Sequence, residues 1–107
     1  MNTLNREATE EYARWFRCLA DGTRLLVLNA VANAAEPITV GEIVAVVGKS
    51  QSTISRHLQV LADDEFVFLE PDGIRTLVRV NDRCMTALPE AAAQIMGRST
   101  GGRAVDR

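Results

Sequence analysis

The sequence predicts a mainly α-helical domain that carries one β-hairpin, with its elements in the order α-α-α-α-β-β-α. Apolar residues recur at three- and four-residue spacing along most of the chain, which is the period of amphipathic helices. Two short helical segments, 40–47 and 51–61, have only a tight turn between them. Two segments rich in β-formers then flank Pro71-Asp72-Gly73, and this turn sequence predicts the hairpin.

Composition places the chain among single-domain globular proteins. It has 107 residues, of which 47% are apolar and 24% charged. We expect one domain over residues 1–97 and a flexible C-terminal tail over residues 98–107, where glycine is frequent. The net charge of −2 does not by itself indicate nucleic-acid binding, although phosphate binding depends on local charge.

Three features predict a cytoplasmic protein that does not bind a membrane. No apolar run approaches the ~20 residues of a membrane span. The N-terminus lacks the layout of a signal peptide. The two cysteines fit a reduced protein better than a disulfide scaffold.

The first helix is predicted over residues 4–20, and Thr3 or Asn2 can cap its start. Its apolar positions are Leu4, Ala8, Tyr12, Trp15, Phe16 and Leu19. They include the only Trp and the only Tyr of the chain. This aromatic surface packs either on its own domain or in a dimer contact, and the sequence leaves both alternatives open.

A second helix is predicted from Asp21, a good N-cap, to about Ala34. One side of it carries Leu25, Leu28, Val31 and Ala32. Pro37 discourages the helix from continuing, so a turn follows. We expect Ile38 to make a short extended contact after that turn.

The next two helices are short and sharply bounded. Thr39 and Glu42 have the spacing of a capping box, with the threonine at the N-cap and the glutamate at the third helical position. Gly48 ends this helix, and Ser50 caps the next one almost at once. Two short helices joined in this way indicate a helix-turn-helix unit.

The second helix of this unit has one apolar and one polar side. At about 100° per residue, its apolar side carries Ile54, Leu58 and Leu61. Its polar side carries Ser52, Ser55, Arg56 and Gln59. A row of hydrogen-bonding side chains with one charge suits a helix that reads base edges. The alternative is an ordinary amphipathic surface helix, which usually carries more Glu and Lys.

The hairpin is predicted from strands over 66–70 and 74–80, and the second strand alternates apolar with basic or polar residues. Asn81 or Asp82 can cap a final helix, which either kinks at Pro89 or restarts there. The apolar side of this last helix comprises Met85, Leu88, Ala92, Ile95 and Met96.

Two motifs resemble those of a known family. The segment Leu19-Ala20-Asp21-Gly22-Thr23-Arg24-Leu25 resembles the Leu-Ala-Asp-Pro-Thr-Arg signature of ArsR/SmtB-type bacterial repressors. Residues 50–61 are similar to the recognition-helix pattern of that family, and the likeness covers about residues 10–96. The sequence departs from the signature at Gly22, where proline is usual. The resemblance implies a winged helix-turn-helix fold.

The resemblance also implies a function. It indicates a homodimer, joined through the first and last helices, that represses transcription by binding an inverted-repeat operator in double-stranded DNA. An effector would then release the operator. The alternative from another class is a winged-helix module that binds proteins. We expect no enzymatic activity, because no catalytic spacing or phosphate-binding loop is present.

Contacts to DNA are assigned to the recognition helix and the hairpin. An arginine can pair bidentately with guanine and a glutamine with adenine, whereas the residues at the helix entrance can bind phosphate. Arg75 is the candidate in the wing, unless it is simply a solvated strand arginine. His57 projects toward the packed side and is predicted to be structural. The predicted DNA-binding residues are Gln51, Ser52, Thr53, Ser55, Arg56, Gln59 and Arg75.

The metal sites that the resemblance implies are absent or incomplete. Residues 38–44 lack the Cys-x-Cys pair expected on the helix before the recognition helix. Asp82-Arg83-Cys84 begins the spacing of the other site, but Ile95 stands where a histidine is expected.

Cys18 and Cys84 remain as candidate effector ligands, since the implied dimer interface brings their helices together. Two thiolates could bind a thiophilic metal or metalloid ion such as mercury or arsenic. They could instead form a redox-switched disulfide, or both could be small buried apolar residues. The sequence leaves these three alternatives open, and no other cofactor is expected.

Overall fold

The structure is a computed structural model that describes residues 4–97. The five helices within that range are α1 (Arg6–Cys18), α2 (Gly22–Asn33), α3 (Val40–Val47), α4 (Gln51–Asp63) and α5 (Asp82–Ile95). The strands are β1 (Ile38–Thr39), β2 (Val67–Asp72) and β3 (Arg75–Val80). The predicted fold class, a mainly α-helical winged helix-turn-helix domain, is confirmed. The predicted tail, residues 98–107, lies outside the described residues.

The hairpin is part of a three-stranded antiparallel sheet in the order β1-β3-β2. Ile38 pairs with Val78, which confirms the expected extended contact and makes it a strand. The predicted turn is displaced, because β2 continues through Asp72, which pairs with Arg75. The turn therefore consists of two residues, and Gly73 supplies the positive φ of 64° that its first position needs.

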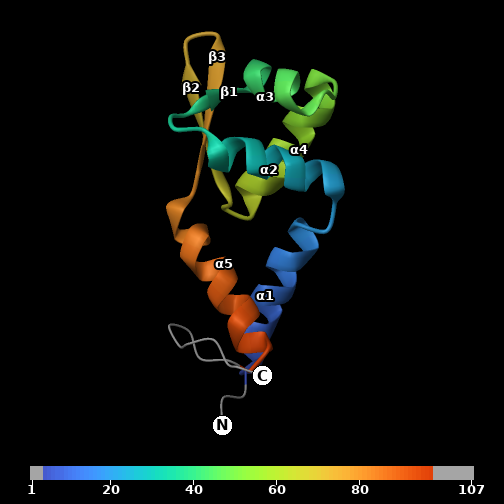
Figure 1. Cartoon of the computed structure of the whole chain (residues 1–107), viewed down its shortest axis with the longest axis vertical. Coiled ribbons are helices and arrows are strands. Elements are labelled where there is room, and N and C mark those ends of the chain that lie inside the picture. The colour runs from blue at the N-terminus through green and yellow to red at the C-terminus, as the bar shows by residue number, and fades with distance from the viewer. Residues whose placement is uncertain (1–3, 98–107) are drawn as a thin grey trace.

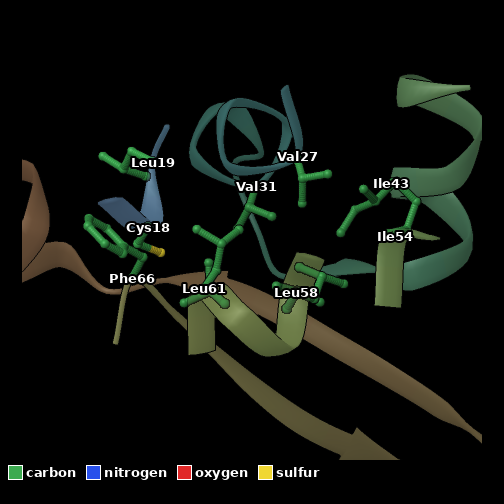
Figure 2. Close-up of a cluster of buried hydrophobic side chains, with 11 residues drawn as sticks. Cys18, Leu19, Val27, Val31, Ile43, Ile54, Leu58, Leu61 and Phe66 are labelled. Atoms are coloured by element: carbon green, nitrogen blue, oxygen red, sulfur yellow. The ribbon is translucent and has the colours of Figure 1, made fainter. Parts of the chain in front are cut away.

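The core lies between α2, α3, α4 and the sheet, as Figures 1 and 2 show. Its largest fully buried side chains are Phe66, Ile43, Ile54, Leu58, Leu61, Val27, Val67 and Val78. The predicted core side of α2 is partly wrong. Val27 and Val31 are the buried residues of α2, whereas Leu25 is 48% exposed, because α3 and α4 cover the neighbouring stripe of the helix.

Helices α1 and α5 project together from one end of this core (Figure 1). The cap predicted for α1 is wrong. Asn5 is the N-cap, and its side-chain oxygen accepts from the Ala8 N–H at 2.7 Å. Asn81 caps α5 as expected, and α5 runs continuously through Pro89. The Tyr12 hydroxyl donates to the Gln94 side chain at 3.1 Å and so links the two helices.

Candidate DNA-binding surface

The helix-turn-helix unit is fixed by hydrogen bonds at every helix end. The Thr39 hydroxyl accepts from the Glu42 N–H at 3.1 Å, and the Glu42 carboxylate accepts from the Thr39 N–H at 2.8 Å. This reciprocal bonding is the predicted capping box, and it holds the pKa of Glu42 below its usual value. Gly48 ends α3 in the left-handed conformation with a φ of 82°, which a residue with a side chain rarely adopts. The turn therefore sets the angle between α3 and α4.

Helix α4 presents its polar side to solvent. The Ser50 hydroxyl caps the helix by accepting from the Thr53 N–H at 3.2 Å. Ile54, Leu58 and Leu61 are buried, as the sequence predicts. The residues exposed on the outer side are Gln51, Ser52, Ser55, Arg56 and Gln59.

Two of the predicted contact residues have partners within the chain. Thr53 is only half-exposed, and its hydroxyl accepts from the Ser50 hydroxyl at 3.0 Å. The Gln59 amide donates to the Asp63 carboxylate at 3.0 Å. A base contact by Gln59 therefore requires exchange of this bond.

His57 is a structural residue, as predicted. It is 6% exposed, and its Nδ1 accepts from Arg24 Nε at 3.3 Å. Desolvation lowers the pKa of His57, and the Arg24 charge acts in the same direction, whereas the Asp21 carboxylate opposes it. Arg24 also donates to the Cys18 carbonyl oxygen at 2.7 Å. The histidine thereby joins the recognition helix to the ends of α1 and α2.

The wing, formed by β2, β3 and their turn, has both of its arginines paired. Arg75 Nη2 lies 2.7 Å from an Asp72 carboxylate oxygen, and Arg79 Nε lies 2.7 Å from Glu70. Sequence reasoning missed these pairs because they depend on the register of the hairpin. The Arg75 side chain is exposed, as the predicted DNA contact requires, but its guanidinium group is already bound to the Asp72 carboxylate.

A hollow separates the wing from the helix-turn-helix unit. It has a volume of about 330 Å³, and its wall includes residues from α3, α4 and the wing. The residues that line it are Thr39, Val40, Gly41, Gln51, Ser55, Ile74, Arg75 and Thr76. Two predicted recognition residues and the predicted wing contact therefore face one space.

The two cysteines belong to α1 and α5, and each contacts a backbone carbonyl near the C-terminal end of α4. The Cys18 sulfur is 3.9 Å from the Val60 carbonyl oxygen, and the Cys84 sulfur is 3.4 Å from that of Glu65. Burial, together with the Asp64 carboxylate, raises the pKa of Cys18 to about 11, and burial also raises the pKa of Cys84. Among residues 4–97, no group of three or more His, Cys, Asp or Glu residues is placed to hold a metal ion.

Within the described part of the chain, no helix has the length and apolar character needed to span a bilayer.

Comparison with known proteins places the chain in a family. Residues 21–67 match the family model described as bacterial regulatory protein, arsR family. The probable mercury resistance operon repressor of Streptomyces lividans is 34% identical in an alignment 99 residues long, which covers 83% of this chain and 78% of that protein.

Solved structures agree in fold. NolR from Sinorhizobium fredii aligns with a TM-score of 0.67 and 29% identity over 92% of this chain and 100% of its own. The homodimeric winged helix-turn-helix DNA-binding domain of Mb0332 from Mycobacterium bovis aligns with a TM-score of 0.68 and 26% identity over 89% of this chain and 87% of its own. With its fold, its capped recognition helix and these similarities, the chain belongs to the ArsR/SmtB family of winged helix-turn-helix transcriptional repressors.

Proposed function

We propose that this repressor acts as a homodimer, binds an inverted-repeat operator with α4 of each protomer, and is released by a thiophilic effector at Cys18 and Cys84. The observation that carries the proposal is the exposed polar side of α4. It combines one arginine with amide and hydroxyl groups on a helix whose opposite side is fully packed. These arginine, amide and hydroxyl groups complement the hydrogen-bond donors and acceptors of base edges in the major groove.

Each residue of the surface has a role in this proposal. Arg56 pairs bidentately with guanine, and Gln59 with adenine after it leaves Asp63. Arg75 contacts phosphate or the minor groove once it exchanges Asp72 for the DNA. At the N-terminal end of α4, the free N–H groups of the first turn bind backbone phosphate. The remaining contacts come from Gln51, Ser52, Thr53 and Ser55.

The proposed dimer forms through α1 and α5. These helices and the residue that follows α5 expose large apolar side chains, namely Phe16, Met85, Ile95 and Met96. A second chain that covers this surface would make an isologous interface, and the related domain from M. bovis is homodimeric. Two α4 helices about 34 Å apart would then reach successive major grooves on one side of the operator. In this proposal residues 1–97 supply both DNA binding and dimerisation.

The effector step uses the position of the two thiols. A soft ion such as Hg²⁺ displaces one proton from each thiol and forms two sulfur–metal bonds. Both sulfurs would then move away from the carbonyl groups of residue 60, in the last turn of α4, and of residue 65, which follows that helix. The relative from S. lividans supports mercury as this ion. The raised pKa values of the two thiols oppose both oxidation and metal binding, since both proceed through the thiolate, so the choice of a metal ion over a redox switch rests on the S. lividans relative.

The DNA-binding part is tested with duplexes selected by the wild-type chain from a random library. Arg56→Ala is expected to weaken binding by about 1–3 kcal/mol and to relax the preference at one base pair. Lys49→Ala, the matched control, is expected to change affinity without changing the preferred sequence. If the wild-type chain shows no sequence-preferring, salt-sensitive binding, the proposal is wrong.

The effector part is tested by adding Hg²⁺, arsenite or peroxide to the complex. Cys18→Ser and Cys84→Ser are expected to keep operator affinity and to lose release by Hg²⁺. Thr86→Ala, an exposed change on α5 that keeps both thiols, should respond like the wild-type chain. Release of both cysteine variants by Hg²⁺ would show that the cysteines are structural only.

A further inference from the structure

The tip of the wing carries an apolar side chain that the structure leaves entirely in solvent. Ile74 has a relative exposure of 104%, the largest of the exposed large apolar residues in the described part of the chain. It occupies the second position of the two-residue turn between β2 and β3. Single exposed apolar residues are common on protein surfaces, so exposure alone does not indicate a role for Ile74. Whether Ile74 has a role depends on where the residue lies.

The turn itself does not require isoleucine. Gly73, at the first position, supplies the positive φ that joins the two strands. The second position tolerates many residues, and polar ones are preferred at such turns. A β-branched apolar side chain there gains no packing from residues 4–97. Any stabilisation that this side chain contributes therefore comes from a contact outside that part of the chain.

The charges behind the tip are neutralised within the wing. Arg75 is paired with Asp72 and Arg79 with Glu70, both at 2.7 Å. The Arg79 guanidinium also lies over the Phe68 ring, 4.7 Å from its centroid. The wing thus carries two cations and two anions, and its most protruding group is uncharged.

The tip lies on the same side of the molecule as the recognition helix. Ile74 and Arg75 line the hollow of about 330 Å³ together with Gln51 and Ser55 of α4. DNA that lies against the start of α4 therefore also meets the tip. In homeodomains, a helix that reads the major groove is accompanied by an arm in the adjacent minor groove, and the tip of the wing protrudes far enough from α4 to act in the same way.

We propose that Ile74 enters the minor groove beside each half-site and makes an apolar contact with the sugars and the groove floor, which selects A·T pairs there. This inference rests on the proposed operator binding. The exocyclic amine of guanine projects into the minor groove and would collide with a branched side chain at the floor, whereas A·T pairs carry no such group. Apolar side chains are used in this way by other minor-groove binders. Ile74 is thus a specificity-determining residue that reads shape without charge.

The contact has a distinct dependence on salt. An apolar contact releases no counterions, so Ile74→Ala is expected to weaken binding about fivefold to tenfold at every salt concentration, with an unchanged salt slope. Arg75→Ala, the matched neighbour, is expected to lower the slope by about one if it contacts a phosphate. Ile74→Val should retain most of the affinity.

The base preference is tested on the selected operator by changing the flanking pairs under the wing. Replacing A·T with G·C is expected to weaken the wild-type chain but not Ile74→Ala. Replacing G·C with inosine·C, which removes only the minor-groove amine, should restore wild-type binding. Thermal unfolding of Ile74→Ala should match that of the wild-type chain, since the side chain is fully exposed.

Three outcomes would overturn the inference. Ile74→Ala could bind as tightly as the wild-type chain, its salt slope could change, or inosine could fail to restore binding. These outcomes leave the proposed function intact as long as Arg56→Ala still impairs recognition. Failure of the wild-type chain to select any operator would instead overturn the proposed function and this inference with it.

Discussion

The central body of the molecule and its two projecting helices differ in how completely they are packed. The eight largest fully buried side chains all lie between Val27 and Val78, within α2, α3, α4 and the sheet or directly beside them. The element pairs in extensive contact belong to this body as well. By contrast, α1 and α5 leave Phe16, Met85 and Ile95 exposed, and Met96 beside α5 is 75% exposed.

This difference separates two tasks. The body is stabilised mainly by its own residues, with Cys18 at the end of α1 and the adjacent Leu19 completing its core, so it can hold α4 in one orientation. The exposed apolar sides of α1 and α5 contribute to stability only when another surface buries them. This contrast supports the proposal that the body contacts DNA and that the projecting helices form the dimer interface.

The largest expected effect comes from a cavity in the body. Leu58→Ala removes a buried side chain of α4 and is expected to lower the free energy of unfolding by about 2–5 kcal/mol. Urea unfolding followed by circular dichroism measures this loss. Met85→Ala, a comparable truncation on exposed α5, should change the free energy of unfolding by less than about 0.5 kcal/mol when both truncations are made in the Ile95→Lys chain, which we expect to be monomeric. If both changes lowered the free energy of unfolding equally, the body and α5 would not differ in how completely they are packed.

A smaller effect is expected at the helix caps. Thr39→Ala breaks the capping box of α3 and should cost about 1 kcal/mol of global stability. Asn5→Ala removes the cap of α1, where it should increase local fraying with little effect on global unfolding. Hydrogen exchange distinguishes the two results. If Asn5→Ala destabilises the whole chain as much as Thr39→Ala, α1 is part of the body.

The smallest effect concerns pH. The pKa of His57 is lowered in the folded state, mainly by desolvation, so the unfolded chain binds this proton more tightly. Stability is therefore full above the ordinary histidine pKa of about 6.5 and is lost as pH falls through the interval below it. Denaturation at several pH values should show this loss, and His57→Gln should reduce it. An unchanged pH dependence in a folded His57→Gln variant would contradict the assigned environment.

Local signals in the sequence predicted much of the fold because the relevant atoms are close in the chain. Asp21, Thr39 and Ser50 cap the helices that they were expected to cap. The predictions failed where the answer depends on distant contacts. Leu25 and Val27 are equally apolar, and only the placement of α3 and α4 decides that Val27 is buried.

The candidate site shows the same limit. The outer side of α4 follows from helical periodicity alone, and its exposure is as expected. The pairing of Arg75 with Asp72 depends on a hairpin turn displaced from its expected position. The hollow that brings Ile74 beside Gln51 requires the packing of the wing against the helices. Neither the Arg75–Asp72 pair nor the hollow can be predicted from the local sequence pattern.

The central claim, that α1 and α5 assemble two self-sufficient bodies, is tested most directly by the mass of Ile95→Lys in solution. Ile95 is exposed on α5 in the single chain, so a lysine there should leave the body folded. Sedimentation equilibrium should give twice the chain mass for the wild-type protein and the mass of one chain for the variant, with unchanged helical circular dichroism. A dimeric Ile95→Lys, or a wild-type chain that is monomeric at micromolar concentration, would contradict the account.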